Sequence, residues 1–457
     1  MAASLPAIHA DVNRALQSVF LSKADEAARR TGFTRRESKL SGSVFVQTLT
    51  FGWLHNPNAT LEELAQVATH LGVPISPQGL DQRFGPPAAA LLEQVLQDAV
   101  LRVLSTDPVA VPVLQRFPGG VDVLDTTTLT LPAVFAGAWP GSGQHDSAAG
   151  IKAQVRLNLV NGSLTGPFLF PARDHDQVGT LHSAPLTPGT LLLADLGFFS
   201  LDRFQELDQA KVYWLSRVQV GTNFTDASGR VQTAAAFLRE HQDKDMVEMT
   251  VAMGATHRLP CRLIAIRVPP HVAAERRRNL RKGCGRRGRH SRKRNRQGRI
   301  CKVHPDRWVL AEWNVYVTNA PPELLSAREA WVLARCRWQI ELLFKLWKSE
   351  GHVDESRSEK PWRILCEIYA KLLGMVVQHW LLLVGCWSHG DRSLVKASRT
   401  VRRYAPSLAV AVRYCHGHMV FAILANIEND LRTGCRVNRR RRAPPTHQLL
   451  SNLSEAG

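Results

Sequence analysis

The sequence lacks the features that place a protein in or across a membrane. Its longest apolar run of nearly spanning length is 372–385, which Gln378 and His379 interrupt, and it falls short of the roughly 20 residues that a bilayer requires. The N-terminal residues do not show the basic, apolar and small-residue pattern of a signal peptide. We therefore expect a core helix at this run, a cytoplasmic protein and no membrane partner.

Cysteine is scarce as well. The 8 cysteines among 457 residues have no paired spacing, which argues against a disulfide framework and fits a reducing compartment. Four residues of zinc-binding type do occur within a short span: Cys284, His290, Cys301 and His304. Their gaps do not follow the usual close-pair pattern, and arginine, lysine and glycine fill most of the intervening positions. The sequence alone does not decide whether these four residues bind a metal ion, and we favour the alternative of a basic segment without metal.

Acidic residues are few compared with basic ones. The chain has 39 Asp and Glu against 58 Lys and Arg, a formal net charge of +19, and residues 276–302 alone carry 14 Lys and Arg and no acid. The rest of the chain has a formal net charge of only about +5. Such a basic loop predicts contact with DNA phosphates, through residues such as Arg286 and Arg287. A disordered, solvated loop is the alternative.

A charged and apolar helix is predicted around residues 335–348. Its polar face would carry Arg337, Glu341, Lys345 and Lys348, which recur at steps of four, four and three. Beside this row runs an apolar stripe, formed by Leu333, Ile340, Phe344 and Trp347. A solvated helix with internal ion pairs is the alternative. Three cations around one acid suit a phosphate, with the acid left to hold a metal ion.

Two further acids are found in predicted strands. Asp125 lies within a β-branched and apolar run that begins at Val121, and Asp195 follows the apolar residues 191–194. An acid in such a place is unfavourable unless it is paired, bound to metal or at an exposed strand end. Asp122 would point to the opposite strand face from Asp125, so at most one of them can serve. Two strand acids and one helix acid are the arrangement of an RNase H-like fold.

These residues together resemble the DDE transposases of bacterial insertion sequences, in the branch with a tyrosine, arginine, glutamate and lysine signature. In that branch the arginine precedes the glutamate by four residues and the lysine follows it by seven, as Arg337, Glu341 and Lys348 do. The segments 124–127 and 194–198 resemble the two aspartate motifs. Ala334 stands where the branch has its tyrosine, so the contact of that hydroxyl has no counterpart at this position.

The resemblance implies an enzyme that cleaves and joins DNA strands. Asp125, Asp195 and Glu341 would hold two Mg²⁺ or Mn²⁺ ions, since oxygen ligands suit these cations and clustered carboxylates need a counter-charge. Arg337 and Lys348 would hold the phosphate, and Arg217 is a further phosphate contact by its place after a predicted strand. The family implies that Trp313 stacks on an unpaired DNA base; a core tryptophan is the alternative. The partners would be double-stranded DNA, both element ends and target, and a second protomer.

The predicted fold class is α/β, an RNase H-like mixed sheet with flanking helices, interrupted by a β-rich insertion because 145 residues separate Asp195 from Glu341. A metal-dependent nuclease of the same fold and a non-catalytic DNA-binding protein remain alternatives. Five segments are predicted: a helical DNA-binding domain at 1–110, the first part of the catalytic core at 111–224, the insertion with its basic loop at 225–320, the second part of the core at 321–390, and a basic helical region at 391–457.

Overall fold

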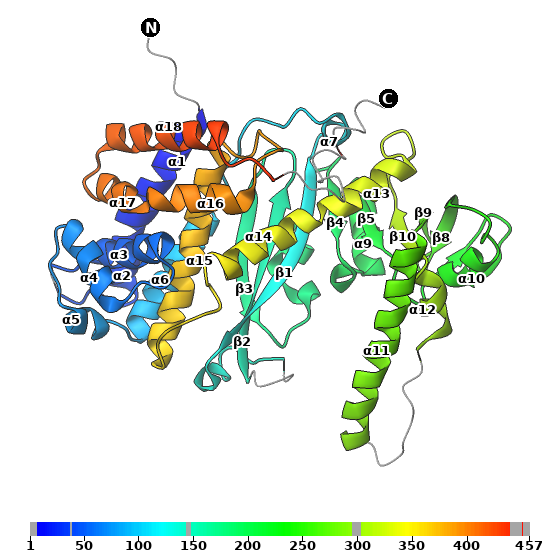
Figure 1. Ribbon diagram of the computed structural model, residues 1–457, viewed down its shortest axis with the longest axis horizontal. Helices are drawn as coiled ribbons and strands as arrows, with labels where there is room; N and C mark the ends of the chain where they lie inside the picture. Colours follow the sequence, from blue (N-terminus) through cyan, green and yellow to red (C-terminus); the bar gives the residue numbers. More distant parts are fainter. Residues whose placement is uncertain (1–6, 37–38, 143–147, 295–302, 439–449, 451–457) are drawn as a thin grey trace, which may run out of the picture. The chain divides into compact units, whose positions relative to one another are not determined.

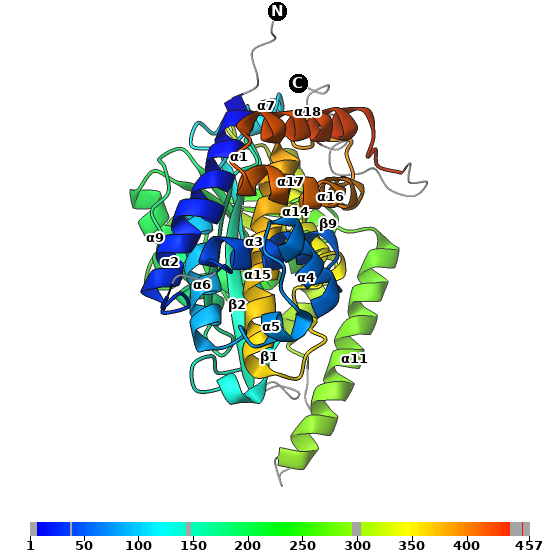
Figure 2. The ribbon, with the colours of Figure 1, turned by 90° about the vertical axis from the view of Figure 1, so that its left-hand side faces the viewer.

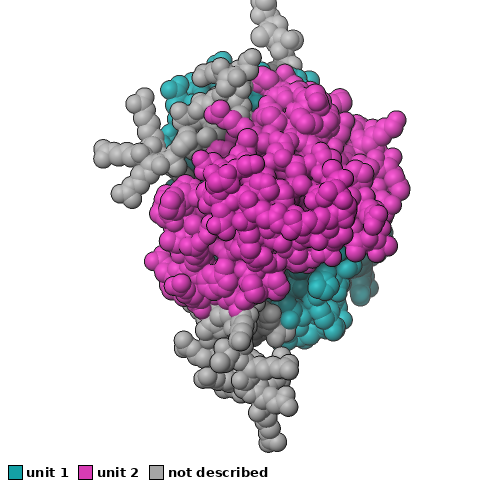
Figure 3. All heavy atoms as spheres, turned by 90° about the vertical axis from the view of Figure 1, so that its right-hand side faces the viewer, with its two compact units in different colours: residues 1–111, 123–184, 338–448 teal, residues 112–122, 185–337, 449–457 magenta. Residues whose placement is uncertain are grey.

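The computed structural model describes residues 7–36, 39–142, 148–294, 303–438 and 450, with backbone alone for 283–294. The chain forms two compact units, which Figure 3 shows in different colours. Unit 1 comprises residues 1–111, 123–184 and 338–448, and unit 2 comprises residues 112–122, 185–337 and 449–457. The strands belong to a ten-stranded mixed sheet flanked by helices, which confirms the predicted fold class.

Unit 1 brings together helices from both ends of the chain. The N-terminal ones are α1 (Ala7–Gln17), a π-helical turn (Ser18–Lys23), α2 (Ala24–Arg30), α3 (Gly42–His55), α4 (Leu61–His70), α5 (Pro77–Asp81) and α6 (Pro86–Val100). The C-terminal ones are α14 (Trp338–Ser349), α15 (Pro361–Leu383), α16 (Leu394–Arg403), α17 (Ala405–Arg413) and α18 (Gly417–Thr433). Figures 1 and 2 show α1 to α6 beside α16 to α18, with α1 packed on α18 and α3 on α17.

Helix α15 forms the centre of this helical part. It packs against α3 and α6, and its residues from Leu365 to Leu383 are all buried. By length and apolarity it is the one helix in the described ranges that would pass as a membrane span, but 94% of that stretch is buried inside the protein. The core helix predicted from the run 372–385 is therefore present.

Unit 1 also contains three strands of the sheet: β1 (Val121–Leu131, whose first two residues belong to unit 2), β2 (Ala149–Asn158) and β3 (Leu164–Pro171). Their order is β3-β2-β1, and β2 pairs with β3 in antiparallel register. A turn at Asn161-Gly162, a dipeptide that favours turns, joins these two strands, where Asn158 N–H donates to the Ser163 carbonyl at 2.9 Å. A buried histidine fixes the turn, because His379 Nε2 lies 2.8 Å from the Gly162 carbonyl oxygen.

Gly162→Ala is expected to lower the free energy of unfolding by about 2 kcal/mol. Gly162 has φ +71°, and a Cβ there would lie 2.6 Å from Trp387 and 2.7 Å from Leu383. Chemical denaturation monitored by circular dichroism measures the effect. Gly137→Ala is the matched control, since a Cβ at Gly137 meets nothing within 4 Å. Equal stability of the two variants would contradict the packing described for the turn.

Unit 2 contains the other strands, in the order β4-β5-β10-β9-β8-β6-β7. They are β4 (Leu191–Ala194), β5 (Tyr213–Arg217), β6 (Asn223–Thr225), β7 (Val231–Thr233), β8 (Met246–Met253), β9 (Leu259–Arg267) and β10 (Trp313–Thr318). Helix α9 (Leu201–Gln209) links the parallel strands β4 and β5. β10 pairs antiparallel with both β5 and β9, so the strands predicted for the insertion continue the sheet of β4 and β5.

The remaining helices of unit 2 are α7 (Pro112–Gln115), α10 (Ala234–Arg239), α11 (Pro270–Arg294), α12 (Pro305–Leu310) and α13 (Ala327–Cys336). One prediction is corrected here. The basic segment 276–302 is not a loop up to Arg294 but part of α11, because arginine and lysine are good helix formers and no proline follows Pro270 in this stretch. Residues 295–302 lie outside the described residues. Strand β10 begins only at Trp313, since Pro305 and a His304 cap start α12 before it.

Candidate active site

Asp195 follows directly after the buried strand β4, at its carboxyl end. The backbone turns here into a short 3-10 helix, where Phe198 N–H donates to the Asp195 carbonyl at 2.9 Å. The carboxylate oxygen Oδ1 is buried and has no hydrogen-bond partner within the described ranges. Burial of an unpaired carboxylate oxygen is unfavourable unless a cation satisfies it. Asp195 is therefore a candidate metal ligand.

Asp125 lies in the middle of β1, in unit 1. Its side chain is half-buried, and Oδ1 accepts a hydrogen bond from the Thr126 N–H at 2.8 Å. The neighbouring acid on the opposite strand face, Asp122, is buried. Asp125 is thus the more accessible of the two.

Glu341 lies in the first turn of α14, and this helix is bonded directly to β1. Lys348 Nζ donates to the Thr128 carbonyl at 2.9 Å, while Ile340, Phe344 and Trp347 are buried as predicted. Glu341 precedes Lys348 by about 10 Å along the helix axis, and Asp125 precedes Thr128 by about 10 Å along the strand. Both acids therefore belong to elements of unit 1 that are joined by a hydrogen bond.

The charged row predicted on one helix is divided between two helices. Helix α13 opens with a capping box of Ser326 and Glu329 and ends at Cys336, and α14 begins at Trp338. Arg337 lies between them with helical angles, φ −50° and ψ −30°, where the regular hydrogen-bond ladder is interrupted. Because this break needs neither glycine nor proline, the sequence carries no signal for it. Arg337 belongs to unit 2, whereas Glu341, Lys345 and Lys348 belong to unit 1.

A polar cavity of about 210 Å³ lies within unit 2, at the carboxyl ends of β4 and β5. Ten residues line it: Leu193, Ala194, Leu215, Ser216, Arg217, Arg276, Asn314, Tyr316, Ala334 and Arg337. Asp195 follows the lining residue Ala194. Crevices at the carboxyl ends of parallel strands are the usual ligand sites of open α/β sheets. Three of the lining side chains are guanidinium groups and none is a carboxylate.

The electrostatics of this cavity favour an anion. Burial, followed by the nearby charge of Arg217, lowers the pKa of Arg276. Arg276 is nevertheless held in place, because it donates to the Trp313 carbonyl at 3.1 Å and to Asn314 Oδ1 at 2.7 Å. Partly desolvated cations that repel one another are stabilised by a bound anion, and phosphate accepts hydrogen bonds from guanidinium groups in two-point geometry.

The comparison with protein families identifies the family of this chain. The family model described as "Transposase DDE domain" matches residues 117–376, more than half of the chain. The chain belongs to the DDE transposase family. It is therefore an enzyme that cleaves and transfers DNA strands, acts on DNA and depends on a divalent metal ion.

Several insertion-sequence transposases are similar over most of the chain. The transposase of IS231F from Bacillus thuringiensis subsp. israelensis is 28% identical over 374 residues, covering 77% of this chain and 75% of its own. The transposase of IS1151 from Clostridium perfringens is 22% identical over 384 residues, covering 79% and 78%. The transposase of IS421 from Escherichia coli is 28% identical over 314 residues, covering 64% and 80%.

The acids expected to bind the metal are divided between the two units of the transposase. Asp125 and Glu341 belong to unit 1, and Asp195 belongs to unit 2. Within the part of the chain that the structure describes, no three His, Cys, Asp or Glu side chains are grouped closely enough to hold a metal ion. The side chains of Cys284, His290 and Cys301 lie outside that part, and His304 caps α12 by accepting from Asp306 N–H at 3.3 Å.

The stacking role expected for Trp313 is corrected by the structure. The side chain is 3% exposed, and the Arg267 guanidinium lies 4.5 Å from the ring centroid. Both ring faces are thus unavailable to a base, and Trp313 is the core tryptophan of the alternative interpretation. Arg286 and Arg287 lie on α11, where the structure describes the backbone alone.

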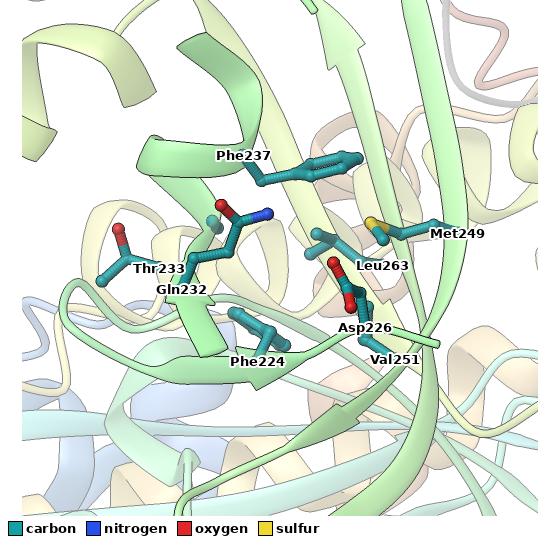
Figure 4. A pocket seen from close by; sticks show the side chains of 9 residues that line it. Phe224, Asp226, Gln232, Thr233, Phe237, Met249, Val251 and Leu263 are labelled. Atoms are coloured by element: carbon teal, nitrogen blue, oxygen red, sulfur yellow. The ribbon is translucent and has the colours of Figure 1, made fainter. Parts of the chain in front are cut away.

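A second, much smaller hollow lies between β6, α10, β8 and β9 of unit 2 (Figure 4). Figure 4 shows Phe237 on one side of it and Phe224 on the other. Its volume of about 10 Å³ admits about one water molecule. The one carboxylate in its lining, Asp226, accepts from the N–H groups of Ser228 and Arg230 at 2.9 and 3.1 Å. This hollow is therefore a packing feature with a structural turn and not a substrate site.

Two members of the polar cavity, Arg276 and Tyr316, have no signal in the sequence that marks them as site residues. Arg276 is the first of many arginines in its segment, and nothing in the sequence distinguishes it from the others. Tyr316 lies in a strand of alternating pattern, where an aromatic residue is ordinary. Only the pairing of β10 with β5, which places Tyr316 opposite Arg217, reveals the association.

Proposed function

We propose that this transposase mobilises a bacterial insertion sequence by cut-and-paste, with Asp125, Asp195 and Glu341 holding two Mg²⁺ or Mn²⁺ ions. The observation that carries the metal assignment is the buried Oδ1 of Asp195, which has no hydrogen-bond partner within the described ranges. Two such ions activate a water or a 3′-hydroxyl and stabilise the leaving oxygen of an in-line displacement. The three acids occur in the order of the family's acid motifs.

The cations of the chain orient the DNA for this reaction. Arg217 and Arg337, which line the polar cavity of unit 2, bind a phosphate near the scissile bond. Lys345 and Lys348 on α14, and Arg286 and Arg287 on α11, contact the DNA backbone. Each phosphate contact releases a counterion, so affinity falls steeply as salt rises. The helical part at 1–110 binds the element ends, two protomers join the two ends as a homodimer, and the reaction takes place in the cytoplasm at the nucleoid.

The proposal is tested with purified protein and linear DNA that carries the gene and its flanking inverted repeats. In Mg²⁺ or Mn²⁺ we expect cleavage at the outer edges of the repeats and covalent joining of the freed 3′ ends to a target plasmid. Chelation of the metal with EDTA is expected to abolish both products. Cleavage without joining would favour the nuclease alternative, and binding without cleavage would favour the non-catalytic one.

A further inference from the structure

The polar cavity of unit 2 contains a tyrosine that neither the family motifs nor the comparisons assign. Ala334, which stands at the tyrosine position of the signature, lines this cavity, and so does Tyr316 of β10. We infer that the Tyr316 hydroxyl, together with Arg276, completes a site for one phosphodiester group and takes the place of the hydroxyl that is missing at position 334. The inference rests on the proposed function, because it deepens the phosphate contact of Arg217 and Arg337.

The position of Tyr316 is set by strand pairing. Tyr316 lies directly opposite Arg217 in the antiparallel pair β10·β5, so the two side chains share one face of the sheet. The tyrosine as a whole is 8% exposed, and it lines the polar cavity. A phenol hydroxyl is a hydrogen-bond donor. A tyrosine that is otherwise buried and lines a polar cavity is placed to donate to a ligand bound there.

Charge identifies the class of that ligand. Burial raises the pKa of the Tyr316 hydroxyl. A smaller effect in the opposite direction comes from the positive charges of Arg217, Arg276, Arg335 and Arg337. The phenol therefore stays protonated and donates, and the guanidinium groups supply the positive charge. Three arginines, a neutral donor and no carboxylate in the lining suit a phosphate oxygen and exclude a cationic ligand.

The strand that carries Tyr316 also fixes the arginine beside it. Arg276 donates to the Trp313 carbonyl and to the Asn314 side chain, and both of these residues belong to β10. The hydroxyl and the guanidinium are thus positioned by a single rigid segment. At about 210 Å³ the cavity is smaller than the pockets of about 300–1,000 Å³ that hold whole organic ligands. It suits one phosphate group of the DNA backbone.

Tyr316→Phe tests the inference, because it removes the hydroxyl and keeps the ring. In single-turnover cleavage of element-end DNA, we expect a rate lower by about 10- to 100-fold, as for one hydrogen bond to a charged group. Tyr213→Phe is the matched control, since Tyr213 lies in the same sheet outside the cavity lining and contacts Phe117; its rate is expected to stay within about twofold of wild type. Equal rates for the two variants would overturn the role of Tyr316.

A second variant tests whether the hydroxyl replaces the one missing at position 334. Tyr316→Phe combined with Ala334→Tyr returns a hydroxyl to the same cavity from α13. We expect the cleavage rate of this double variant to be at least about tenfold higher than that of Tyr316→Phe alone. No recovery would overturn the claim that the two positions are equivalent. If wild type cleaves the DNA and Tyr316→Phe is unaffected, the inference fails while the proposed function stands. If wild type does not cleave in metal, the proposed function itself fails.

Binding of the anion alone gives a readout that does not depend on catalysis. Inorganic phosphate at constant ionic strength is expected to raise the melting temperature of wild type and of Tyr213→Phe by the same amount. The rise is expected to fall to half or less in Tyr316→Phe and in Arg276→Gln. Equal rises in all four proteins would show that the cavity does not bind phosphate through these groups.

Discussion

Asp195→Asn is expected to abolish strand cleavage, with a rate at least about 10³-fold below wild type, since a metal-ligand carboxylate contributes several kcal/mol to catalysis. The same variant is expected to be folded and at least as stable as wild type. The reason is that Asp195 Oδ1 is buried without a hydrogen-bond partner in the described part of the chain. The substitution removes the unfavourable burial of a charged oxygen, and it leaves no hydrogen-bond donor of the protein without its acceptor.

The two measurements together separate a catalytic role from a structural one. Cleavage of element-end DNA in Mg²⁺ gives the rate, and thermal unfolding in EDTA gives the stability. Asp202→Asn is the control, because Asp202 belongs to the same unit, its side chain is 84% exposed, and its carboxylate contacts His257 Nε2 at 2.7 Å. It is expected to cleave at the wild-type rate. An Asp195→Asn protein that is clearly less stable, or that still cleaves, would remove the metal-ligand assignment.

Lys371→Met is expected to lower the free energy of unfolding by about 3–5 kcal/mol. Lys371 Nζ lies 2.7 Å from Glu367 Oε1, and both side chains are at most 5% exposed. The ammonium also donates to the carbonyls of His352 and Glu355 at 2.9 and 2.8 Å, and Ser356 donates to Glu367 Oε2 at 2.8 Å. Removing the lysine leaves a buried carboxylate without its counter-charge.

Urea unfolding followed by tryptophan fluorescence measures this change. Lys39→Met is the control in the same unit, since Lys39 is exposed, and its effect is expected to stay within about 0.5 kcal/mol. Glu367→Gln combined with Lys371→Met removes both charges and is expected to recover part of the loss, because the carboxylate is no longer left alone. A loss below about 1 kcal/mol for the single variant would show that the pair is not buried as described.

This ion pair also lies close in the chain to the helix that carries Glu341. Lys371 and Glu367 bond to His352, Glu355 and Ser356, which come shortly after the end of α14 at Ser349. The pair therefore fixes the segment that connects α14 to α15 within unit 1.

Much of the local structure follows from the sequence because its causes are local. The capping boxes at Thr60 and Ser326 are both present, since each depends on residues only three positions apart. The strand at 191–194 and the turn at Asn161-Gly162 follow from apolar runs and turn residues in the same way. The family, too, was accessible from three short acid motifs and their order.

Where the sequence misled, the deciding contact lay far away along the chain or gave no local signal. Trp313 has the same neighbours in sequence whether it is open to DNA or buried, and the ring is covered by Arg267 of the adjacent strand β9. The break at Arg337 occurs without a helix breaker. The basic segment was predicted as a loop from its charge, while its helix propensity favoured α11.

The sequence by itself determined the enzyme family, the order of Asp125, Asp195 and Glu341, and most helices and strands, because periodicity, caps and motifs depend on residues that are close along the chain. The tertiary structure decided which side chains share the polar cavity. Arg217, Arg276 and Tyr316 come from three separate elements, and Arg337 lies between two helices. More than a hundred positions separate the first of these residues from the last. Only strand register and helix packing bring them together, and neither is encoded in any one stretch of residues.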